Sequence, residues 1–590
     1  MATCINVPQF AFACNVRTAN SVGAPGRRYI GVPLPTDPVP SAIMPKLPTG
    51  ADFIDHEWIN TYDPIGVAAP TPAAKVTANE YVVDKFHPSA TDVNIGDNAI
   101  AGVVYGTTNR PRQSLPPRST FVAGTKIFVY GDGTPLPTTK STNRKFDYDS
   151  WNDKNYRLKF NGTSSEPCWV IGINLPRLQV ERLTISNSAH LLFDGIYLEK
   201  KVARRKGGNV VVDSSKYITF RNGGQYGYEV DDGGSAFTIT GESRATSDFI
   251  VYYNNEMAYH GDFDLVAGTK VKRDFHGWRP LSWCRWLWCL DNRIHHISAD
   301  ACQVNNSGDS STDHSKRPHY IYFAGNEAYH LKENMFDAKN SYHCVVSENF
   351  SYETEESAMI MPNNSEGPLT GYHWAIANII TQTGEWGTGS GIRGSGNEAD
   401  NYTAVIGNFI YDIPKPGLQI ANQTTGDNVR NFFVNNTVVR CSTGINVNIW
   451  QPVLNDWVVD IQGNVFFDCD IEIELRSTGG AEVNLRDNVL YDQRGPEVIL
   501  NKKEVTSDIN TRYADPRFVN SQGSRPTDFL AQPGGSAAGG TSEHQVYRDF
   551  QTLYGLDIRK DLLGSARAPN GAWDIGAVSS SEANQVRPRD

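Results

Sequence analysis

Short runs in which apolar and polar residues alternate recur along the second half of the chain. Each run ends at an asparagine and is followed by a second β-rich run, as in LWCLDNRIHH, YIYFAGNEAYH, CVVSENFSYE, HWAIANIITQ, TAVIGNFIYD and VDIQGNVFFD. Alternation with a period of two, in residues that are β-branched or aromatic, predicts short strands. A third short run follows each pair, as in DACQVN, MFDAKN, SAMIMP, SGIRGS, GLQIAN and GINVNI. The pattern therefore predicts three strands per repeat.

The asparagines between the first two runs are regularly spaced. They are Asn292, Asn326, Asn349, Asn378, Asn408, Asn436, Asn464 and Asn488. Subtraction gives intervals between 23 and 34 residues, in the range of solenoid repeats. The alternatives are a sandwich or a propeller, but a four-stranded propeller blade needs about 40–45 residues. The spacing favours a solenoid.

Three short strands per repeat with an asparagine at a repeated corner resemble the right-handed parallel β-helix of the pectate-lyase-like superfamily. The resemblance implies an all-β, single-stranded solenoid in which the corner asparagines stack in the left-handed region of backbone space, which Asn tolerates. The expected organisation is a Pro-rich N-terminal arm and lead-in over 1–117, the parallel β-helix over 118–500, and final coils with a capping segment over 501–590.

Aligning the third runs predicts which side chains face outward. An apolar column belongs inside the coil: Cys302, Phe336, Met359, Ile392, Leu418 and Ile445. With a period of two, the neighbours then point outward: Gln303, Asp337, Ile360, Arg393, Gln419 and Asn446. A second outward column holds Asn305, Lys339, Pro362, Ser395, Ala421 and Asn448, and the earlier run GYEVDDGG adds Glu229 and Asp231. Charged and amide groups therefore gather on one sheet face, although an Asp337–Lys339 pair alone is equally typical of an exposed salt bridge.

Composition narrows the function classes. A formal net charge of -11 argues against nucleic-acid binding. There is no run of eighteen apolar residues and hence no expected membrane span. The start of the chain does not read as an obvious signal peptide, although the family resemblance implies a secreted, extracellular or periplasmic protein.

Cys4/Cys14 and Cys284/Cys289 are possible disulfide pairs, whereas Cys302 and Cys344 are expected to be buried small hydrophobes. The oligomeric state stays open.

The stretch ENMFDAKNS, with the later SGIRGSGN, is similar to the acid, lysine and arginine layout of the chondroitinase B and alginate lyase group. The Asp–Lys feature also resembles the lysine-based pectate lyases. This resemblance implies β-elimination on a uronate-containing acidic polysaccharide, with Lys339 as base and Arg393 and Asp337 as further catalytic residues. Asp337 would raise the pKa of Lys339 unless it ligates a cation or pairs with Arg393. The substrate carboxylate would be neutralised either by Arg and amide groups or by a cation, for which Ca²⁺ is the candidate, with Glu229, Asp231 and Asp337 as its candidate ligands.

Several further residues are candidates for substrate binding. They are Gln303, Asn305, His296, His330, Lys332, Gln419 and Trp278. Trp278 has two interpretations, a core residue or a sugar-stacking platform, and a lone histidine is more often structural. Two other functions stay open. One is an inverting glycoside hydrolase that pairs Asp337 with Asp231, Glu229 or Glu356. The other is a non-catalytic, tailspike-like glycan-binding rod.

Overall fold

The computed structural model describes residues 67–579 with gaps. The gaps are 73–78, 93–107, 109–110, 117–119, 135–146, 149–156, 181, 201–208, 228–232, 263–273, 306–315, 362–370, 383–386, 395–400, 423–427, 451–455, 494–498, 501–503, 556, 568 and 570. Glu229, Asp231, Cys4, Cys14, Pro362 and Ser395 lie outside the described residues, so the predictions made for them stay predictions.

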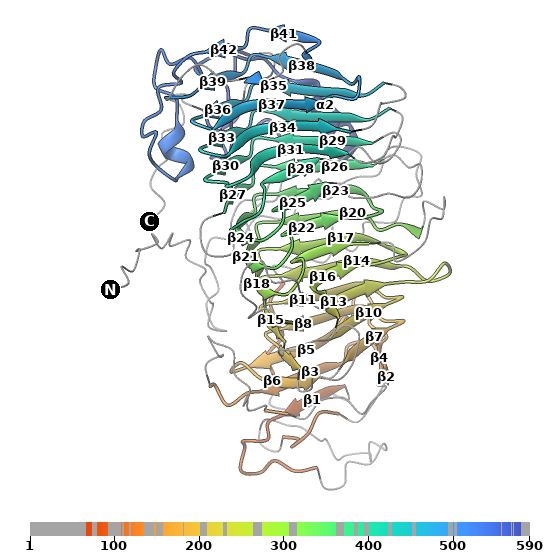
Figure 1. Cartoon of the computed structure of the whole chain (residues 1–590). Coiled ribbons are helices and arrows are strands. Elements are labelled where there is room, and N and C mark those ends of the chain that lie inside the picture. Colours follow the sequence, from red (N-terminus) through yellow and green to blue (C-terminus); the bar gives the residue numbers. More distant parts are fainter. Residues whose placement is uncertain are drawn as a thin grey trace.

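The chain forms three parallel sheets that are stacked into a right-handed parallel β-helix (Figure 1). The 15-stranded sheet contains β1 (Glu80–Val83), β3 (Lys126–Tyr130), β5 (Cys168–Ile173), β8 (Ala189–Asp194), β11 (Lys216–Arg221), β14 (Ser247–Tyr253), β17 (Cys284–Leu290), β20 (His319–Ala324), β23 (Tyr342–Ser347), β26 (Tyr372–Ile376), β29 (Tyr402–Ile406), β32 (Arg430–Val434), β35 (Val458–Gln462), β38 (Glu482–Arg486) and β41 (Ser507–Ile509). The 14-stranded sheet contains β2 (Thr120–Phe121), β4 (Arg157–Phe160), β7 (Leu183–Ser186), β10 (Val210–Asp213), β13 (Gly234–Thr240), β16 (Phe275–Pro280), β19 (Cys302–Val304), β22 (Phe336–Ala338), β25 (Met359–Met361), β28 (Ile392–Gly394), β31 (Pro416–Asn422), β34 (Thr443–Ile449), β37 (Ile471–Ser477) and β40 (Ile499–Leu500). The 13-stranded sheet contains β6 (Arg177–Val180), β9 (Tyr197–Lys200), β12 (Gly224–Tyr226), β15 (Glu256–His260), β18 (Arg293–Ile297), β21 (Glu327–Leu331), β24 (Phe350–Thr354), β27 (Ile379–Thr381), β30 (Phe409–Tyr411), β33 (Thr437–Val439), β36 (Val465–Phe467), β39 (Val489–Tyr491) and β42 (Arg512–Tyr513).

Each coil visits the 15-stranded, the 13-stranded and then the 14-stranded sheet before the next coil begins, as in β20, β21, β22 and β23. The predicted fold class is confirmed, and so is the prediction of three strands per repeat. Parallel pairing already begins between β1 and β3 and continues to β42, so the paired strands extend beyond 118–500 at both ends.

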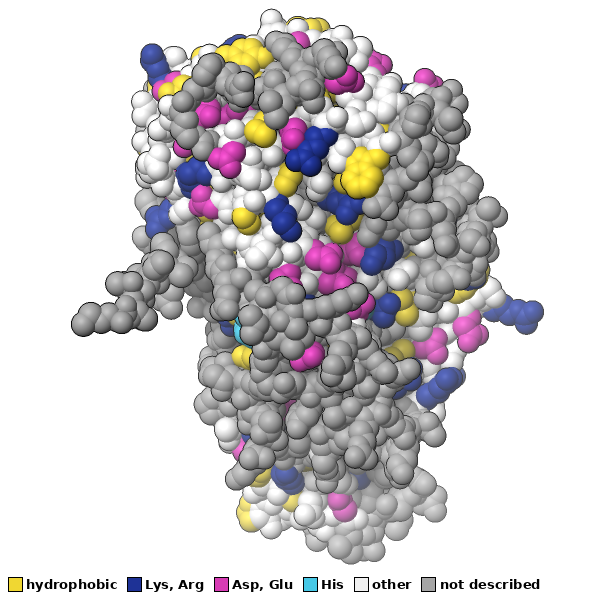
Figure 2. Space-filling model, viewed as in Figure 1, with side chains coloured by type: hydrophobic (Ala, Val, Ile, Leu, Met, Phe, Trp, Pro, Cys, Tyr) yellow, Lys and Arg dark blue, Asp and Glu magenta, His cyan; other side chains and the backbone are white. Residues whose placement is uncertain are grey.

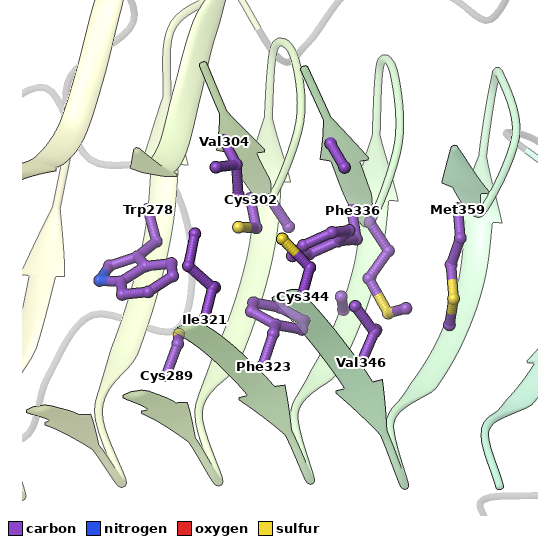
Figure 3. Packing of buried hydrophobic residues seen from close by; sticks show 14 of the residues in the cluster. Trp278, Cys289, Cys302, Val304, Ile321, Phe323, Phe336, Cys344, Val346 and Met359 are labelled. Carbon is purple, nitrogen blue, oxygen red and sulfur yellow. The ribbon is translucent and has the colours of Figure 1, made fainter. Parts of the chain in front are cut away.

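The apolar column of the third strands fills the inside of the coil, as predicted. Cys302 is in register with Phe336, and Phe336 with Met359. These side chains are buried and point toward the opposite sheet, where Ile321 and Phe323 meet them (Figure 3). Trp278 continues the same column one coil earlier, in register with Cys302. Trp278 is fully buried, so its interpretation as a core residue is confirmed and its interpretation as a sugar-stacking platform is wrong.

The predicted asparagine ladder is present, at the corner between the 15-stranded and 13-stranded sheets. In each step the backbone N–H and the side-chain Nδ2 of one Asn donate to Oδ1 of the next, as from Asn378 to Asn408 at 2.9 Å each. The left-handed backbone conformation, however, belongs to the residue before each ladder Asn, such as Ala377 with φ 54°. The conformational prediction was therefore shifted by one position. The left-handed residue turns the chain, and the following Asn is free to stack.

None of the described cysteines forms a disulfide bond. Cys284 and Cys289 are free and buried in the core, so their proposed disulfide is not formed. Cys302 and Cys344 are buried small hydrophobes, as expected.

The C-terminal tail lies against the outside of two sheets. Helix α2 (Gln545–Tyr554) packs on the apolar outer face of the 15-stranded sheet, where Trp286 and Trp288 share one cluster. The 3-10 helix η3 (Pro526–Phe529) packs with Phe518 and Ile575 on the outer face of the 13-stranded sheet. These contacts lie on the sides of the solenoid, and contact with its open end stays a prediction. In the described part of the chain, no helix has the length and apolar character to cross a membrane.

Candidate active site

One row of side chains on the outer face of the 14-stranded sheet forms the candidate site. Strand pairing places these residues on successive rungs, and the register of Trp278 with Cys302 adds Arg279 at the start. We call this row the outer column: Arg279, Gln303, Asp337, Ile360, Arg393, Gln419 and Asn446. Gln303 and Asp337 face away from the core, yet both are buried, Asp337 to 1% exposure. The face is therefore not a simple solvated surface.

Three acidic residues stand in successive coils just before the strands of this sheet. Asp300, Glu333 and Glu356 precede β19, β22 and β25, and we call them the acidic corner. The backbone N–H of Ala301 donates to the Asn334 carbonyl, and that of Glu356 to the Glu333 carbonyl, which keeps the coils in register. Figure 2 shows Asp and Glu side chains gathered at about the level of β22, with Lys and Arg side chains around them.

Asp300 is the most strongly anchored member of the acidic corner. Its carboxylate accepts hydrogen bonds from Gln303 Nε2 at 3.0 Å and from the backbone N–H and Nδ2 of Asn334 at 3.0 and 2.8 Å. His276 Nδ1 lies 3.1 Å from Asp300 Oδ2. Burial favours the protonated acid, but the interactions with His276, Lys339 and Asn334 outweigh it and lower the pKa of Asp300. Asp300 is therefore the ionised carboxylate of the site.

The pKa values of two neighbouring carboxyl groups, those of Glu333 and Asp337, are raised instead. Burial, together with the charges of Asp300, Asp274 and Glu356, raises the pKa of Glu333 far above its usual range. Burial and the charge of Asp300 raise the pKa of Asp337 to about 7, although Lys339 opposes the shift. The pKa of Glu356 is also raised, by partial burial of its carboxyl group and by the charge of Asp300, although the residue as a whole is exposed. Ionised and protonated carboxyl groups therefore coexist in one small site.

The basic residues of the site are placed as predicted, but Lys339 keeps its proton. Lys339 Nζ lies 2.7 Å from Asp337 Oδ2. Burial would lower the pKa of Lys339, but Asp337 and Asp300 raise it above the ordinary value. Arg393 stands two rungs beyond Asp337, and its Nε has no hydrogen-bond partner among the described residues. The site therefore has two cations that flank a carboxyl group.

The other predicted substrate-binding residues divide between two faces. Gln303 and Gln419 lie in the outer column, and Asn305 directly follows β19 beside Lys339. His296 and His330 instead lie on the 13-stranded sheet, where their rings stack at 4.2 Å. They are not brought together with Asp337.

Lys332 does not flank the site as a free cation. Its side chain is almost fully buried, and its Nζ lies 2.7 Å from Glu355 Oε1. The prediction that Lys332 binds a substrate carboxylate is therefore contradicted, because this ammonium group is already paired and is shielded from solvent.

The sequence interpretation missed His276, Arg279 and Asp300. His276 and Arg279 lie in the run FHGWRP, which forms β16 and was not recognised as a strand. Trp278 is an inward residue in register with Cys302, so extending the apolar column one coil back would have found this strand. His276, Asp300 and Glu333 also offer ligand atoms within 4.8 Å of one another, close enough for a metal ion.

No protein-family model and no curated protein matches this chain by sequence. Solved structures do match its fold. The A-module of the Azotobacter vinelandii mannuronan C-5 epimerase AlgE6 has a TM-score of 0.40 and 10% identity, over 70% of this chain and 92% of that one. The catalytic domain of a GH87 alpha-1,3-glucanase in complex with nigerose has a TM-score of 0.35 and 10% identity, over 75% and 71%. The periplasmic alginate epimerase AlgG has a TM-score of 0.31 and 12% identity, over 67% and 78%. With identities of 10–12% and TM-scores below 0.5, these likenesses carry no argument about the chemistry of this chain.

Proposed function

We propose that this protein is a carbohydrate-active enzyme that hydrolyses a glycosidic bond of a polysaccharide at Asp337. The observation that carries the proposal is the environment of the Asp337 carboxyl group. It is buried near ionised Asp300, and Asp337 Oδ1 has no hydrogen-bond partner among the described residues. A general acid works best when its pKa is close to the working pH. The pKa of Asp337, raised to about 7, meets that requirement.

Glu356 is the proposed partner of Asp337. Hydrolysis with two carboxyl groups needs one that protonates the leaving oxygen and one that deprotonates the attacking water. Asp337 takes the first role and Glu356 the second, because Glu356 is exposed and its charge contributes to the shift of Asp337. Asp300 touches neither reacting group in this scheme; it holds the proton on Asp337 through its negative charge.

The outer column supplies the means to position a glycan chain. Successive rungs of a parallel sheet lie about 4.8 Å apart, and Arg393 and Gln419 present guanidinium and amide donors along them, whereas buried Gln303 already donates to Asp300. Arg393 would suit a sugar carboxylate, so an acidic polysaccharide is the proposed substrate class.

β-Elimination by Lys339 is the second candidate. It is favoured by the two cations, Lys339 and Arg393, that flank Asp337 on the same face. It is disfavoured because the pKa of Lys339 is raised, and a base must first lose its proton.

The products separate the candidates. The purified protein would be incubated with a panel of neutral and uronate-containing polysaccharides, with and without chelator. Hydrolysis is expected to give new reducing ends without ultraviolet absorbance, whereas elimination gives an unsaturated, absorbing end. An absorbing product would overturn the hydrolase proposal. Binding to a glycan without any product would favour the tailspike-like rod.

A further inference from the structure

A group of possible metal ligands lies near Asp337, and one of its members, Asp300, also raises the pKa of Asp337. His276, Asp300 and Glu333 come from three successive coils, and one ligand atom of each lies within 4.8 Å of the others. His276 Nδ1 and Asp300 Oδ2 are 3.1 Å apart, close to the spacing of two ligands on one ion at bond lengths of about 2.0–2.2 Å.

Two buried amide groups point to a ligand at this place. Gln303 and Asn334 each donate through their side-chain nitrogen to the Asp300 carboxylate, which fixes the amide against the cluster. The oxygen of each amide has no hydrogen-bond partner among the described residues, although both residues are more than nine-tenths buried. Buried polar atoms without a partner are costly. An amide oxygen can coordinate a cation directly or through water.

His276 adds a further buried atom without a partner. The residue is 3% exposed, and its Nδ1 has no hydrogen-bond partner among the described residues, although it lies 3.1 Å from Asp300 Oδ2. An imidazole nitrogen is a common metal ligand.

We propose that His276, Asp300 and Glu333 bind one divalent cation of the Zn²⁺ or Mn²⁺ class. An imidazole ligand favours such ions over Mg²⁺ and Ca²⁺, which prefer all-oxygen sites. The proposed site differs from the Glu229, Asp231 and Asp337 set in its ligands and in the ion. It does not depend on which bond the enzyme cleaves.

Equilibrium dialysis and thermal unfolding of the full chain test the proposal. Protein stripped with a chelator is dialysed against Zn²⁺, Mn²⁺, Ca²⁺ or Mg²⁺, and bound metal is measured together with Tm. We expect one Zn²⁺ or Mn²⁺ per chain, an affinity at least tenfold above that for Ca²⁺ or Mg²⁺, and a Tm rise of several degrees at saturation. Failure to bind Zn²⁺ or Mn²⁺ at millimolar concentration would overturn the site, and tighter binding of Ca²⁺ would overturn the ion class.

Variants locate the ion. Glu333→Gln keeps the side-chain shape and is expected to weaken Zn²⁺ and Mn²⁺ binding at least tenfold, as is His276→Asn, with Tm in chelator reporting that each variant is folded. The matched control is Glu256→Gln, because Glu256 Oε1 forms a similar pair with His295 Nε2 at 2.9 Å on the 13-stranded sheet. Unchanged binding in Glu333→Gln, or equal loss in Glu256→Gln, contradicts the assignment. Since dialysis does not use turnover, an inactive Asp337 variant that still binds metal separates this proposal from the proposed function.

Discussion

Asp337 combines two properties that exposed carboxylates do not have. It faces outward in a strand, yet it is buried, and it lies beside an Asp300 carboxylate that His276 and two amides keep ionised. Two like charges in one buried place push their pKa values apart, which is the usual origin of acid and base roles in neighbouring carboxyl groups.

Substitution of the proposed acid tests this role directly. Asp337→Asn keeps the shape of the side chain but cannot deliver a proton, so kcat is expected to fall by about 10²–10⁴-fold. Reducing-end release on the best polysaccharide of the panel measures the loss. Asp412→Asn serves as control, because Asp412 is paired with Arg440 beside the 13-stranded sheet. A fall of less than tenfold in Asp337→Asn would remove Asp337 from the mechanism.

Substitution of Lys339 distinguishes hydrolysis from elimination. The ammonium group lowers the pKa of Asp337, so Lys339→Ala raises that pKa further. If Asp337 is the general acid, turnover persists and the alkaline limb of the pH–rate profile moves to higher pH. Complete loss of turnover in Lys339→Ala, at every pH between 5 and 9, would instead identify Lys339 as the base.

The raised pKa of Asp337 also predicts how stability depends on pH. The folded protein holds this proton up to about pH 7, whereas the unfolded chain releases it near 3.8, the ordinary pKa of Asp. The folded state therefore binds more protons between these values, and its stability falls as pH rises through the window. In chelator, Tm is expected to decrease from pH 5 to pH 8, and by a smaller amount in Asp337→Asn. An equal decrease in both proteins would show that Asp337 does not titrate in this range.

At the scale of elements, the asparagine ladder shows what the sequence could and could not reveal. The interval between the Asn residues and the period of two were sufficient to place most third strands and their inward and outward sides. Backbone dihedrals were not accessible in this way, because the left-handed position before each Asn is occupied by residues as different as Asp291, Gly325 and Ala377. The burial of Asp337 and Gln303 was also missed, since a period of two gives the side of a sheet but not what covers it.

The sequence named Glu356 as a possible partner of Asp337, but the grouping of the acidic corner was not predicted, for a related reason. Asp300, Glu333 and Glu356 lie in the turns between strands, where no periodicity operates. Their proximity results from the register of successive coils, which the strands set. A column alignment extended into the turns would have brought them together.

The ladder itself should be a main source of stability. Asn378 donates to Val346 O and Asn408 Oδ1 and accepts from the N–H and Nδ2 of Asn349. Asn378→Ala leaves several of these buried groups without a partner, at about 1–3 kcal/mol each, and is expected to lower the urea midpoint strongly.

The neighbouring position provides the matched control. In Ala377→Gly, relief of the left-handed backbone, about 1–2 kcal/mol, roughly offsets the loss of one methyl group, about 0.8 kcal/mol. The urea midpoint should therefore change little. Similar losses for Asn378→Ala and Ala377→Gly would mean that the turn, rather than the ladder, carries the stability.

At the scale of the whole molecule, the solenoid exposes an apolar outer face that a second layer must cover. The 15-stranded sheet carries Trp374, Tyr402 and Phe432 on its outside, and α2 lies over them. The candidate site is on a different sheet, so the covering layer and the proposed reaction use separate faces of the same coils. This separation allows the tail to stabilise the solenoid without obstructing Asp337.

Tyr554 is the residue through which this covering can be tested. It is fully buried at the end of α2, and its hydroxyl group is hydrogen-bonded to His343 Nδ1 at 2.8 Å and to Trp374 Nε1 at 3.1 Å. Tyr554→Ala removes a large aromatic ring and is expected to cost about 3–5 kcal/mol, whereas Tyr554→Phe loses only the hydrogen bonds, about 1–2 kcal/mol. Urea unfolding gives both values, and Arg548→Ala, on the exposed side of the same helix, should stay near the wild type. If Tyr554→Ala were as stable as Arg548→Ala, the helix would not be part of the cooperative structure, and the apolar face of the 15-stranded sheet would need another cover.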